Sequence, residues 1–155
     1  MVRILFVCHG NICRSPMAEY VMGDLIRQEG LNGSFQVASA ATSSEEIGSG
    51  VYPPVRAFLS RAGIDSSRHK ARQITLADYT LYDMIVAMDS YNVRSLYRLF
   101  GGDPQRKISL LLSHLPGSAD TEIADPWYTR NFRLTWDQVN RSCKALLEKL
   151  LTQTD

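Results

Sequence analysis

The sequence lacks the features that mark membrane proteins and proteins held by bulk charge. All of its apolar runs fall well short of a membrane-spanning helix. The formal net charge is only +1, from 17 basic and 16 acidic side chains. Proteins that bind nucleic acid or a membrane surface electrostatically carry a large excess of basic residues. We therefore expect no nucleic acid and no membrane among the partners of this chain, and we expect any positive potential to be local.

Cysteine is scarce as well. The chain has 3 cysteines, and two of them, Cys8 and Cys13, lie in one short stretch. The odd count, and a start at Met1 that shows no signal peptide, argue against a disulfide framework and favour a cytoplasmic protein. The spacing of Cys8 and Cys13 does not suit zinc, and no second pair of ligands accompanies them. We expect neither a metal site nor a cofactor.

The chain also lacks repeats, low-complexity segments and linkers, which favours a single domain over residues 1–155. Short apolar segments alternate with segments of helical periodicity. We expect strands over 4–7, 34–39, 83–88 and 108–112, and helices over 16–29, 54–62, 91–100 and 135–151. This alternation predicts an α/β fold with a parallel sheet covered on both faces, in which ligands bind beyond the carboxyl ends of the strands.

What the sequence does contain is a phosphate-binding pattern between the first strand and the first helix. Cys8 ends the strand, Arg14 stands six positions later, and Ser15-Pro16 is typical of an N-cap and first helical turn. The amino end of a helix attracts anions, and a loop wound over it aims further N–H groups inward. We expect a phosphate cradle formed by His9, Gly10, Asn11, Ile12, Cys13, Arg14 and Ser15.

Cys8 is the candidate nucleophile at the base of this cradle. The positive field that holds a phosphate also favours a thiolate over a thiol. The planar guanidinium of Arg14 can hold two phosphate oxygens at once, and the Ser15 hydroxyl is close enough in sequence to reach the sulfur. A single cysteine after a strand is usually an inert core residue. The combination of strand, cysteine, Gly-Asn, arginine and helix instead predicts nucleophilic attack on phosphorus.

These residues resemble the low-molecular-weight protein tyrosine phosphatases. The resemblance covers nearly the whole chain and rests on residues 8–16, Ser39-Ala40-Ala41, His69-Lys70-Ala71-Arg72-Gln73-Ile74, Ala87-Met88-Asp89 and Asp125-Pro126. It implies a single-domain, three-layer, Rossmann-like fold whose parallel sheet has the strand order 2-1-3-4. It also implies metal-free hydrolysis of phosphotyrosine and small aryl phosphates through a phosphocysteine intermediate. The implied partners are phosphotyrosine-containing proteins, with inorganic phosphate or other oxyanions as product or inhibitors.

Asp125 is the candidate general acid, because expulsion of an alkoxide or phenoxide requires a proton donor within reach. It lies in a segment expected to be a long loop over 113–127, and Pro126 stiffens the backbone behind it. An Asp-Pro pair alone is more typical of a turn. The family resemblance implies that Asp125 protonates the leaving phenol and then acts as the base that activates water.

Aromatic side chains beside Asp125 predict a slot for the ring of the substrate. Trp127 and Tyr128 follow at once, and the resemblance implies that they form one wall. Packing of both rings onto the body of the protein is the alternative. Glu45 stands where many relatives carry an aromatic wall, and His9 stands where leucine is common. The slot is therefore expected to be acidic on one side and to bind acidic phosphopeptides weakly.

Three residues are expected to support the cradle. The resemblance implies that Ser39 and His69 brace Asn11 through hydrogen bonds. Asp89 ends the third strand, where two roles fit the sequence: a contact with the site, or a cap for the following helix, for which Ser90 is also a candidate.

Cys13 has a redox role implied by the same resemblance. Oxidation of Cys8 to a sulfenic acid would be trapped by Cys13 as a disulfide, which protects the nucleophile from further oxidation.

Other functions fit parts of the pattern. Phosphoarginine phosphatases share the expected fold but tend to have threonine at the position of Ile12, whose apolar side chain suits a phenyl ring better. A thiol-dependent arsenate reductase needs further cysteines after the third strand, and residues 88–108 contain none. A non-catalytic phosphate-binding module would keep Arg14 without Cys8 or Asp125. A Rossmann nucleotide binder requires a glycine motif that is missing after the first strand.

Overall fold

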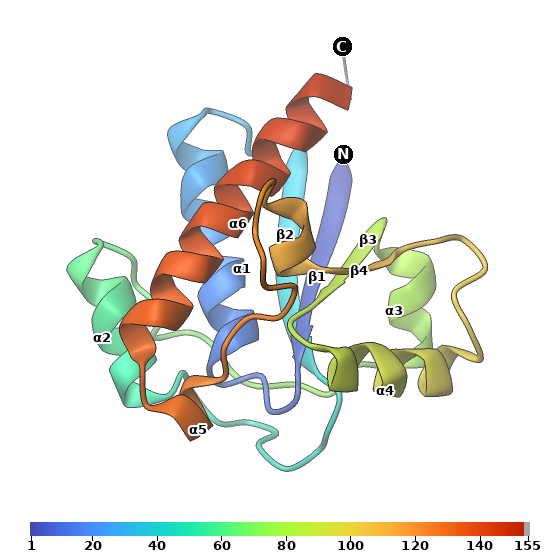
Figure 1. Cartoon of the computed structure of the whole chain (residues 1–155), viewed down its shortest axis with the longest axis horizontal. Coiled ribbons are helices and arrows are strands. Elements are labelled where there is room, and N and C mark those ends of the chain that lie inside the picture. Colours follow the sequence, from blue (N-terminus) through green and yellow to red (C-terminus); the bar gives the residue numbers. More distant parts are fainter. Residues whose placement is uncertain (154–155) are drawn as a thin grey trace.

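The computed structural model describes residues 1–153 and is built on a parallel sheet (Figure 1). The strands are β1 (Val2–Cys8), β2 (Phe35–Ala41), β3 (Met84–Ala87) and β4 (Ile108–Leu110). They pair in the order β2-β1-β3-β4, and every pair is parallel. The α/β fold expected from the sequence and the strand order implied by the family resemblance are confirmed. β1 and β3 are neighbours, with Val7 beside Ala87, so their carboxyl ends meet at the middle of one edge.

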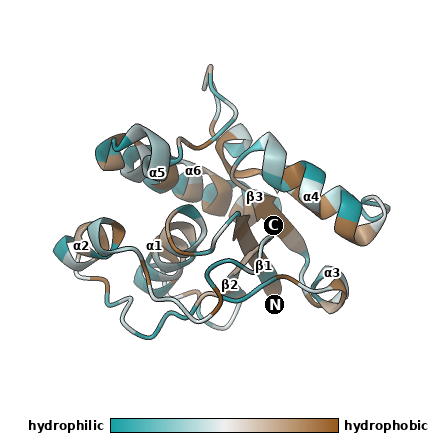
Figure 2. Ribbon diagram, turned by 90° about the horizontal axis from the view of Figure 1, so that it is seen from below, coloured by the Kyte–Doolittle hydropathy of each residue, from teal (hydrophilic) through white to brown (hydrophobic). Residues whose placement is uncertain are grey.

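Helices cover both faces of this sheet. α1 (Arg14–Gln28), α2 (Pro53–Arg61), α5 (Pro126–Thr129) and α6 (Phe132–Gln153) lie on one side, and α3 (Leu76–Leu81) and α4 (Ser90–Phe100) lie on the other (Figure 2). The strands between them form the most hydrophobic part of the ribbon, as expected of a sheet buried on both faces. Within residues 1–153, no helix has the length and apolar character needed to cross a bilayer.

The alternation of side chains along β1 decides the direction in which the candidate nucleophile points. Ile4, Phe6 and Cys8 belong to the core cluster that includes residues of α1, α2 and α6. Leu5 and Val7 belong to the cluster on the side of α3 and α4. All five are at most 3% exposed. Cys8 therefore faces the helix whose first turn carries Arg14.

The start of α1 differs from the expected one. The helix begins at Arg14, and Cys13 rather than Ser15 occupies the N-cap position, without a side-chain cap hydrogen bond. Ser15 lies inside the first turn, where its hydroxyl contacts Cys8 and Asn11 instead. Because no side chain caps this turn, its N–H groups are not shielded from an incoming anion.

Asp89, and not Ser90, caps α4. The Oδ1 atom of Asp89 accepts the backbone N–H of Asn92 at 2.8 Å, and Asn92 Oδ1 accepts the backbone N–H of Asp89 at 3.1 Å. An aspartate is favoured there because its charge also complements the helix dipole. Ser90 is the first residue of the helix and donates its backbone N–H to Glu122 at 2.6 Å.

The segment after β4 is more ordered than the sequence predicts. A 3-10 helix over Leu111–His114 ends β4 at Leu110, and α5 lies where a loop was expected. α6 begins at Phe132 rather than at residue 135, because Asn131 Oδ1 accepts the backbone N–H of Leu134 at 3.0 Å and caps the extra turn.

Candidate active site

Cys8 lies at the bottom of the cradle with two polar neighbours. Its Sγ atom is 3.0 Å from Ser15 Oγ and accepts the backbone N–H of Asn11 at 3.3 Å. The residue is 3% exposed. The structure thus brings Ser15 to the sulfur, as the sequence predicts, and adds a main-chain donor. Both contacts stabilise negative charge on the sulfur when it is a thiolate.

Asn11 holds the cradle loop in shape. Its φ is +59°, a left-handed conformation that asparagine tolerates better than most residues. Its side chain is fully buried. The Nδ2 group donates to Ser15 Oγ at 2.8 Å and to Ser39 Oγ at 2.9 Å, and the backbone N–H of Arg72 donates to Oδ1 at 3.1 Å. His69 Nε2 lies 2.7 Å from the Asn11 carbonyl. Ser39 and His69 are therefore both in contact with Asn11.

Glu19 extends this network and was missed from the sequence. Ser39 Oγ donates to Glu19 Oε1 at 2.5 Å. Burial raises the pKa of Glu19, and the hydrogen bond from Ser39, with the charges of His69 and Arg72, opposes that shift. A glutamate within a predicted helix normally faces water, so no sequence signal singled it out.

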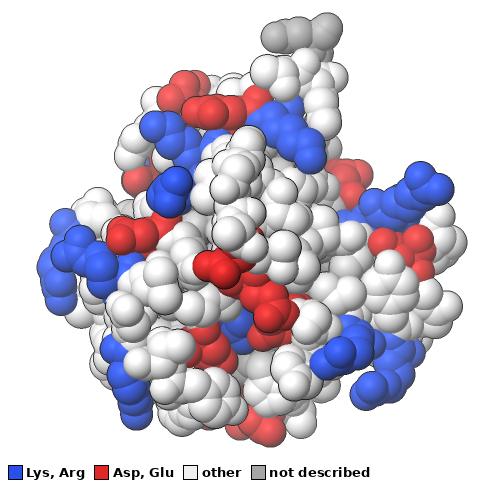
Figure 3. Space-filling model, in the orientation of Figure 1, with Lys and Arg blue, Asp and Glu red and all other residues white. Residues whose placement is uncertain are grey.

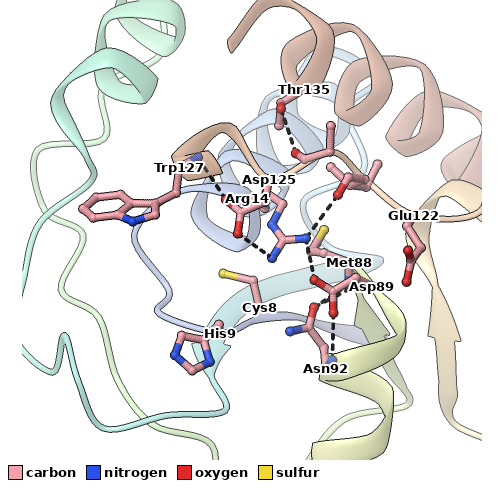
Figure 4. Close-up of polar contacts among 12 residues, drawn as sticks. Cys8, His9, Arg14, Met88, Asp89, Asn92, Glu122, Asp125, Trp127 and Thr135 are labelled. Atoms are coloured by element: carbon pink, nitrogen blue, oxygen red, sulfur yellow. Dashed lines mark hydrogen bonds and ion pairs between the residues drawn. The ribbon is translucent and has the colours of Figure 1, made fainter. Parts of the chain in front are cut away.

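Arg14 carries the positive charge of the site. Its side chain is 4% exposed, and its guanidinium lies between two carboxylates (Figure 4). Nη1 donates to Asp89 Oδ2 at 2.8 Å and to the Ile123 carbonyl at 3.1 Å, and Nη2 donates to Asp125 Oδ2 at 3.3 Å. Burial by itself disfavours the charged form, but the negative charges of Cys8, Asp125 and Asp89 outweigh it and raise the pKa of Arg14.

Asp89 thus combines the two roles that the sequence left open. One carboxylate oxygen caps α4 and the other accepts from Arg14. The cap fixes the carboxylate, and the carboxylate fixes the guanidinium.

Asp125 is the N-cap of α5. Its Oδ1 accepts the backbone N–H of Trp127 at 3.0 Å, while Oδ2 is the atom that faces Arg14. Pro126 occupies the first position of α5, where its missing N–H costs no hydrogen bond. Short as it is, α5 holds the carboxylate beside the cradle.

These groups open into one cavity of about 640 Å³. Cys8 and Arg14 lie at its base, with Asp125 and Trp127 on one side and the start of α4 on another (Figure 4). The cavity is lined by the predicted phosphate-binding and wall residues except Asn11 and Ser15, which are fully buried and hydrogen-bonded to each other.

The predicted wall consists of two different rings. Trp127 is 46% exposed and packs against Tyr52, with ring centroids 5.1 Å apart. Tyr128 is 82% exposed. Trp127 therefore packs against the body of the protein, as the packing alternative predicts, and also presents surface to the cavity. Tyr128 lines the same cavity and is largely exposed to solvent.

Glu45 and His9 lie at the mouth of the cavity. His9 Nε2 is 3.1 Å from Glu45 Oε2, and both side chains are largely exposed. Several further lining residues were not singled out from the sequence: Thr42, Glu46, Tyr91, Asn92 and Ser95. The last three share one face of α4, so the position of Asp89 just before that helix was the signal available.

Carboxylates outnumber cations around the cavity. Glu45, Glu46, Asp89 and Asp125 line it, against the single guanidinium of Arg14. In the orientation of Figure 1, acidic side chains gather across the middle of the face, near the segment that leads into α5 (Figure 3). The positive base of the site is therefore surrounded by a negative rim.

Cys13 lines the same cavity and is 6% exposed. Burial raises the pKa of its thiol to about 12, helped by the nearby charges of Cys8 and Asp125. At neutral pH this sulfur is a protonated thiol. Among residues 1–153, no group of three or more His, Cys, Asp or Glu side chains is arranged to hold a metal ion.

Comparison with known proteins gives a consistent answer. Residues 3–155 match the family model described as low molecular weight phosphotyrosine protein phosphatase. The chain is 36% identical over 150 residues to the low molecular weight protein-tyrosine-phosphatase YfkJ of Bacillus subtilis, which covers 97% of this chain and 96% of YfkJ. It is 41% identical over 150 residues to the human low molecular weight phosphotyrosine protein phosphatase, with 94% of each chain covered.

Solved structures agree with this similarity. The crystal structure of YfkJ superposes with a TM-score of 0.97 at 35% identity and covers 100% of this chain and 98% of YfkJ. The crystal structure of DARP, an arginine phosphatase of Drosophila, superposes with a TM-score of 0.87 at 31% identity, covering 95% of this chain and 96% of DARP.

Proposed function

The chain belongs to the low molecular weight phosphotyrosine protein phosphatases, and we propose that it hydrolyses phosphotyrosine in proteins, and small aryl phosphates, with Cys8 as nucleophile, Arg14 as phosphate ligand and Asp125 as general acid. The observation that carries the assignment is that Asp125, 111 positions after Arg14, lines one cavity with Cys8 and Arg14 at the carboxyl ends of β1 and β3. The family is one of hydrolases that act on phosphotyrosine.

In the first step the Cys8 thiolate attacks phosphorus in line with the ester bond. A sulfur–phosphorus bond forms, the bond to the phenol oxygen breaks, and Asp125 donates its proton to that oxygen. Arg14 and the N–H groups of the cradle hold the equatorial oxygens, where negative charge is stabilised by fixed donors. Positioning and electrostatics supply the rate enhancement.

The ion pair between Arg14 and Asp125 suggests how substrate prepares the acid. In the free site Nη2 of Arg14 donates to Asp125 Oδ2. A bound phosphoryl dianion competes for this donor, so substrate binding frees the Asp125 carboxyl for its contact with the leaving oxygen. Asp89 still holds Nη1 and keeps the guanidinium in place.

In the second step water hydrolyses the phosphocysteine. Asp125, now a carboxylate, takes a proton from the attacking water, and the sulfur leaves as a thiolate that accepts from Ser15 Oγ and from Asn11 N–H. Inorganic phosphate is the product and, together with other oxyanions, is the expected competitive inhibitor. We place this thiolate chemistry in the reducing cytoplasm.

The proposal is tested by assaying the purified, reduced protein in EDTA against p-nitrophenyl phosphate, a phosphotyrosine peptide and a phosphoarginine peptide. We expect hydrolysis of the first two. Ile12 lines the cavity. Its apolar side chain suits a phenyl ring and carries no polar group that could bind a guanidinium. Preferential hydrolysis of phosphoarginine, the activity named for DARP, would establish the alternative, and phosphate binding without hydrolysis would establish a binding module.

The negative rim is expected to select among phosphotyrosine peptides. At low ionic strength, kcat/KM should be higher for a peptide with basic residues beside the phosphotyrosine than for one with acidic residues there. Glu45→Gln should raise kcat/KM for the acidic peptide by about threefold, the size expected for one exposed charge. Glu148→Gln, an exposed glutamate on α6, is the matched control. Equal rates for both peptides with the wild type would contradict the prediction.

We further propose that Cys13 protects the nucleophile. Hydrogen peroxide oxidises the Cys8 thiolate to a sulfenic acid, and the Cys13 thiol then forms a disulfide with release of water. Because the Cys13 thiol is protonated at neutral pH, it does not compete as a nucleophile before oxidation. After excess peroxide, wild type should regain activity with dithiothreitol, whereas Cys13→Ser, in which the Cys8 sulfenic acid is oxidised on to a sulfinic acid, should not. Equal recovery in both proteins would exclude the disulfide.

A further inference from the structure

The segment Glu122–Asp125, hereafter the acid strap, is held along its length by other elements. Glu122 Oε2 accepts the backbone N–H of Ser90 at the start of α4 at 2.6 Å. Ile123 donates its N–H to the Met88 carbonyl at 2.9 Å and accepts Arg14 at 3.1 Å. The strap is thereby joined to the end of β3, to α1 and to α4 before it reaches Asp125 (Figure 4).

Ala124, the residue directly before the acid, is held by α6. Its backbone N–H donates to Gln138 Oε1 at 2.8 Å, and its carbonyl accepts Thr135 Oγ1 at 2.8 Å. Thr135 and Gln138 are three positions apart and so share one face of the helix. Two side chains therefore supply the hydrogen bonds that a neighbouring strand would otherwise make to Ala124.

Burial favours these contacts. Thr135 is fully buried, Ile123 is 2% exposed, and both hydrogen bonds to Ala124 are partly buried. A polar group that loses its partner away from water carries a free-energy cost, so this position of the strap is favoured over one that breaks the bonds. The next residue, Asp125, is then fixed further by Trp127 N–H and by Arg14.

We propose that Thr135 and Gln138 are positioning residues for the general acid: they hold Ala124 so that Asp125 stands ready over the cradle before substrate arrives. The acid then needs no closing loop to reach the leaving oxygen. General acid catalysis depends on the donor lying within hydrogen-bond distance of the oxygen it protonates, and small displacements of it are costly. This inference rests on the role proposed above for Asp125.

Leaving-group dependence separates this role from a structural one. A misplaced acid harms the expulsion of a weakly acidic phenol and hardly affects a good leaving group that departs unprotonated. Thr135→Val removes the hydroxyl with little change of shape, and Gln138→Met removes the acceptor with similar length. For each variant we expect kcat/KM for phenyl phosphate to fall about tenfold, part of the contribution of a general acid. We expect kcat/KM for 2,4-dinitrophenyl phosphate to change by less than about twofold.

Conservative variants and a control complete the experiment. Thr135→Ser and Gln138→Glu keep the hydroxyl and the acceptor oxygen, and should restore the shallow leaving-group dependence of the wild type. Thr152→Val changes a threonine of the same helix whose hydroxyl bonds only within α6, to the Lys149 carbonyl, and should behave as wild type. Inhibition by inorganic phosphate should stay unchanged in all variants, because the cradle is intact.

Different results would contradict the positioning role and the proposed function. An equal fall of kcat/KM for every leaving group, or no fall at all, would overturn the positioning role. If Thr135→Val does not fold, the comparison of Gln138→Met with Gln138→Glu decides the question. Absence of hydrolysis in the wild type would instead refute the proposed function itself.

Discussion

Replacing Cys8 by serine is expected to lower kcat for p-nitrophenyl phosphate by about 10⁴-fold or more, the scale on which loss of a nucleophile acts in enzymes with covalent intermediates. A serine hydroxyl in the same place is a far weaker nucleophile than a thiolate, and the groups that contact the Cys8 sulfur, the Ser15 hydroxyl and the Asn11 N–H, are not bases. The sulfur is also the leaving group of the second step, a task for which an alkoxide is unsuited. The measurement is steady-state hydrolysis in EDTA with fully reduced protein.

The cradle should survive this substitution. The N–H groups and Arg14 do not depend on the sulfur, so Cys8→Ser should still bind phosphate, as measured by calorimetry. Cys143→Ser is the matched control, because Cys143 is buried in α6 with its thiol directed at the Ala18 carbonyl, away from the cavity. Substantial hydrolysis by Cys8→Ser, or its loss in Cys143→Ser with the fold intact, would contradict a mechanism centred on Cys8.

Asp125→Asn is expected to lower kcat/KM for phenyl phosphate by about 100-fold, within the range that general acids contribute. The amide keeps the size of the side chain and an oxygen that can accept from Trp127 N–H, so α5 should still form. It has no proton to give to the leaving oxygen. The loss should shrink as the leaving phenol becomes more acidic, which a series of substituted aryl phosphates measures directly.

The leaving-group series needs a matched control. Asp137→Asn, an exposed aspartate on α6, should keep the leaving-group dependence of the wild type. Equal losses of activity for good and poor leaving groups would mean that Asp125 stabilises the site without transferring a proton.

Much of the candidate site was predictable because its parts are local in sequence. The turn from β1 into α1 places Cys8, Asn11, Arg14 and Ser15 within one short segment, so the residue types and their spacing define the cradle. The parallel sheet follows from the alternation of strands and helices, and its order from the family resemblance. Side-chain alternation along β1 then directs Cys8 toward α1.

The tertiary structure decided how distant residues act on this cradle. The guanidinium of Arg14 is hydrogen-bonded to Asp89 and Asp125, which lie 75 and 111 positions away in the sequence. The sequence left Asp89 with two possible roles, and only the packing of β3 against β1 shows that it fills both. Ser15 is a second example. Serine is a residue type that often caps helices, but in the structure the Ser15 hydroxyl contacts Cys8 and Asn11 instead.

The acid strap shows most clearly which part of the structure the sequence alone does not predict. Residues 122–124 have no periodicity that predicts structure, since their hydrogen bonds go to β3, α1, α4 and α6. Local patterns record contacts between near neighbours along the chain. The sequence by itself therefore determined the candidate nucleophile, the segment of its cradle and the α/β class of the fold, whereas the place of the candidate acid was decided by long-range contacts that exist only once the sheet and α6 have assembled.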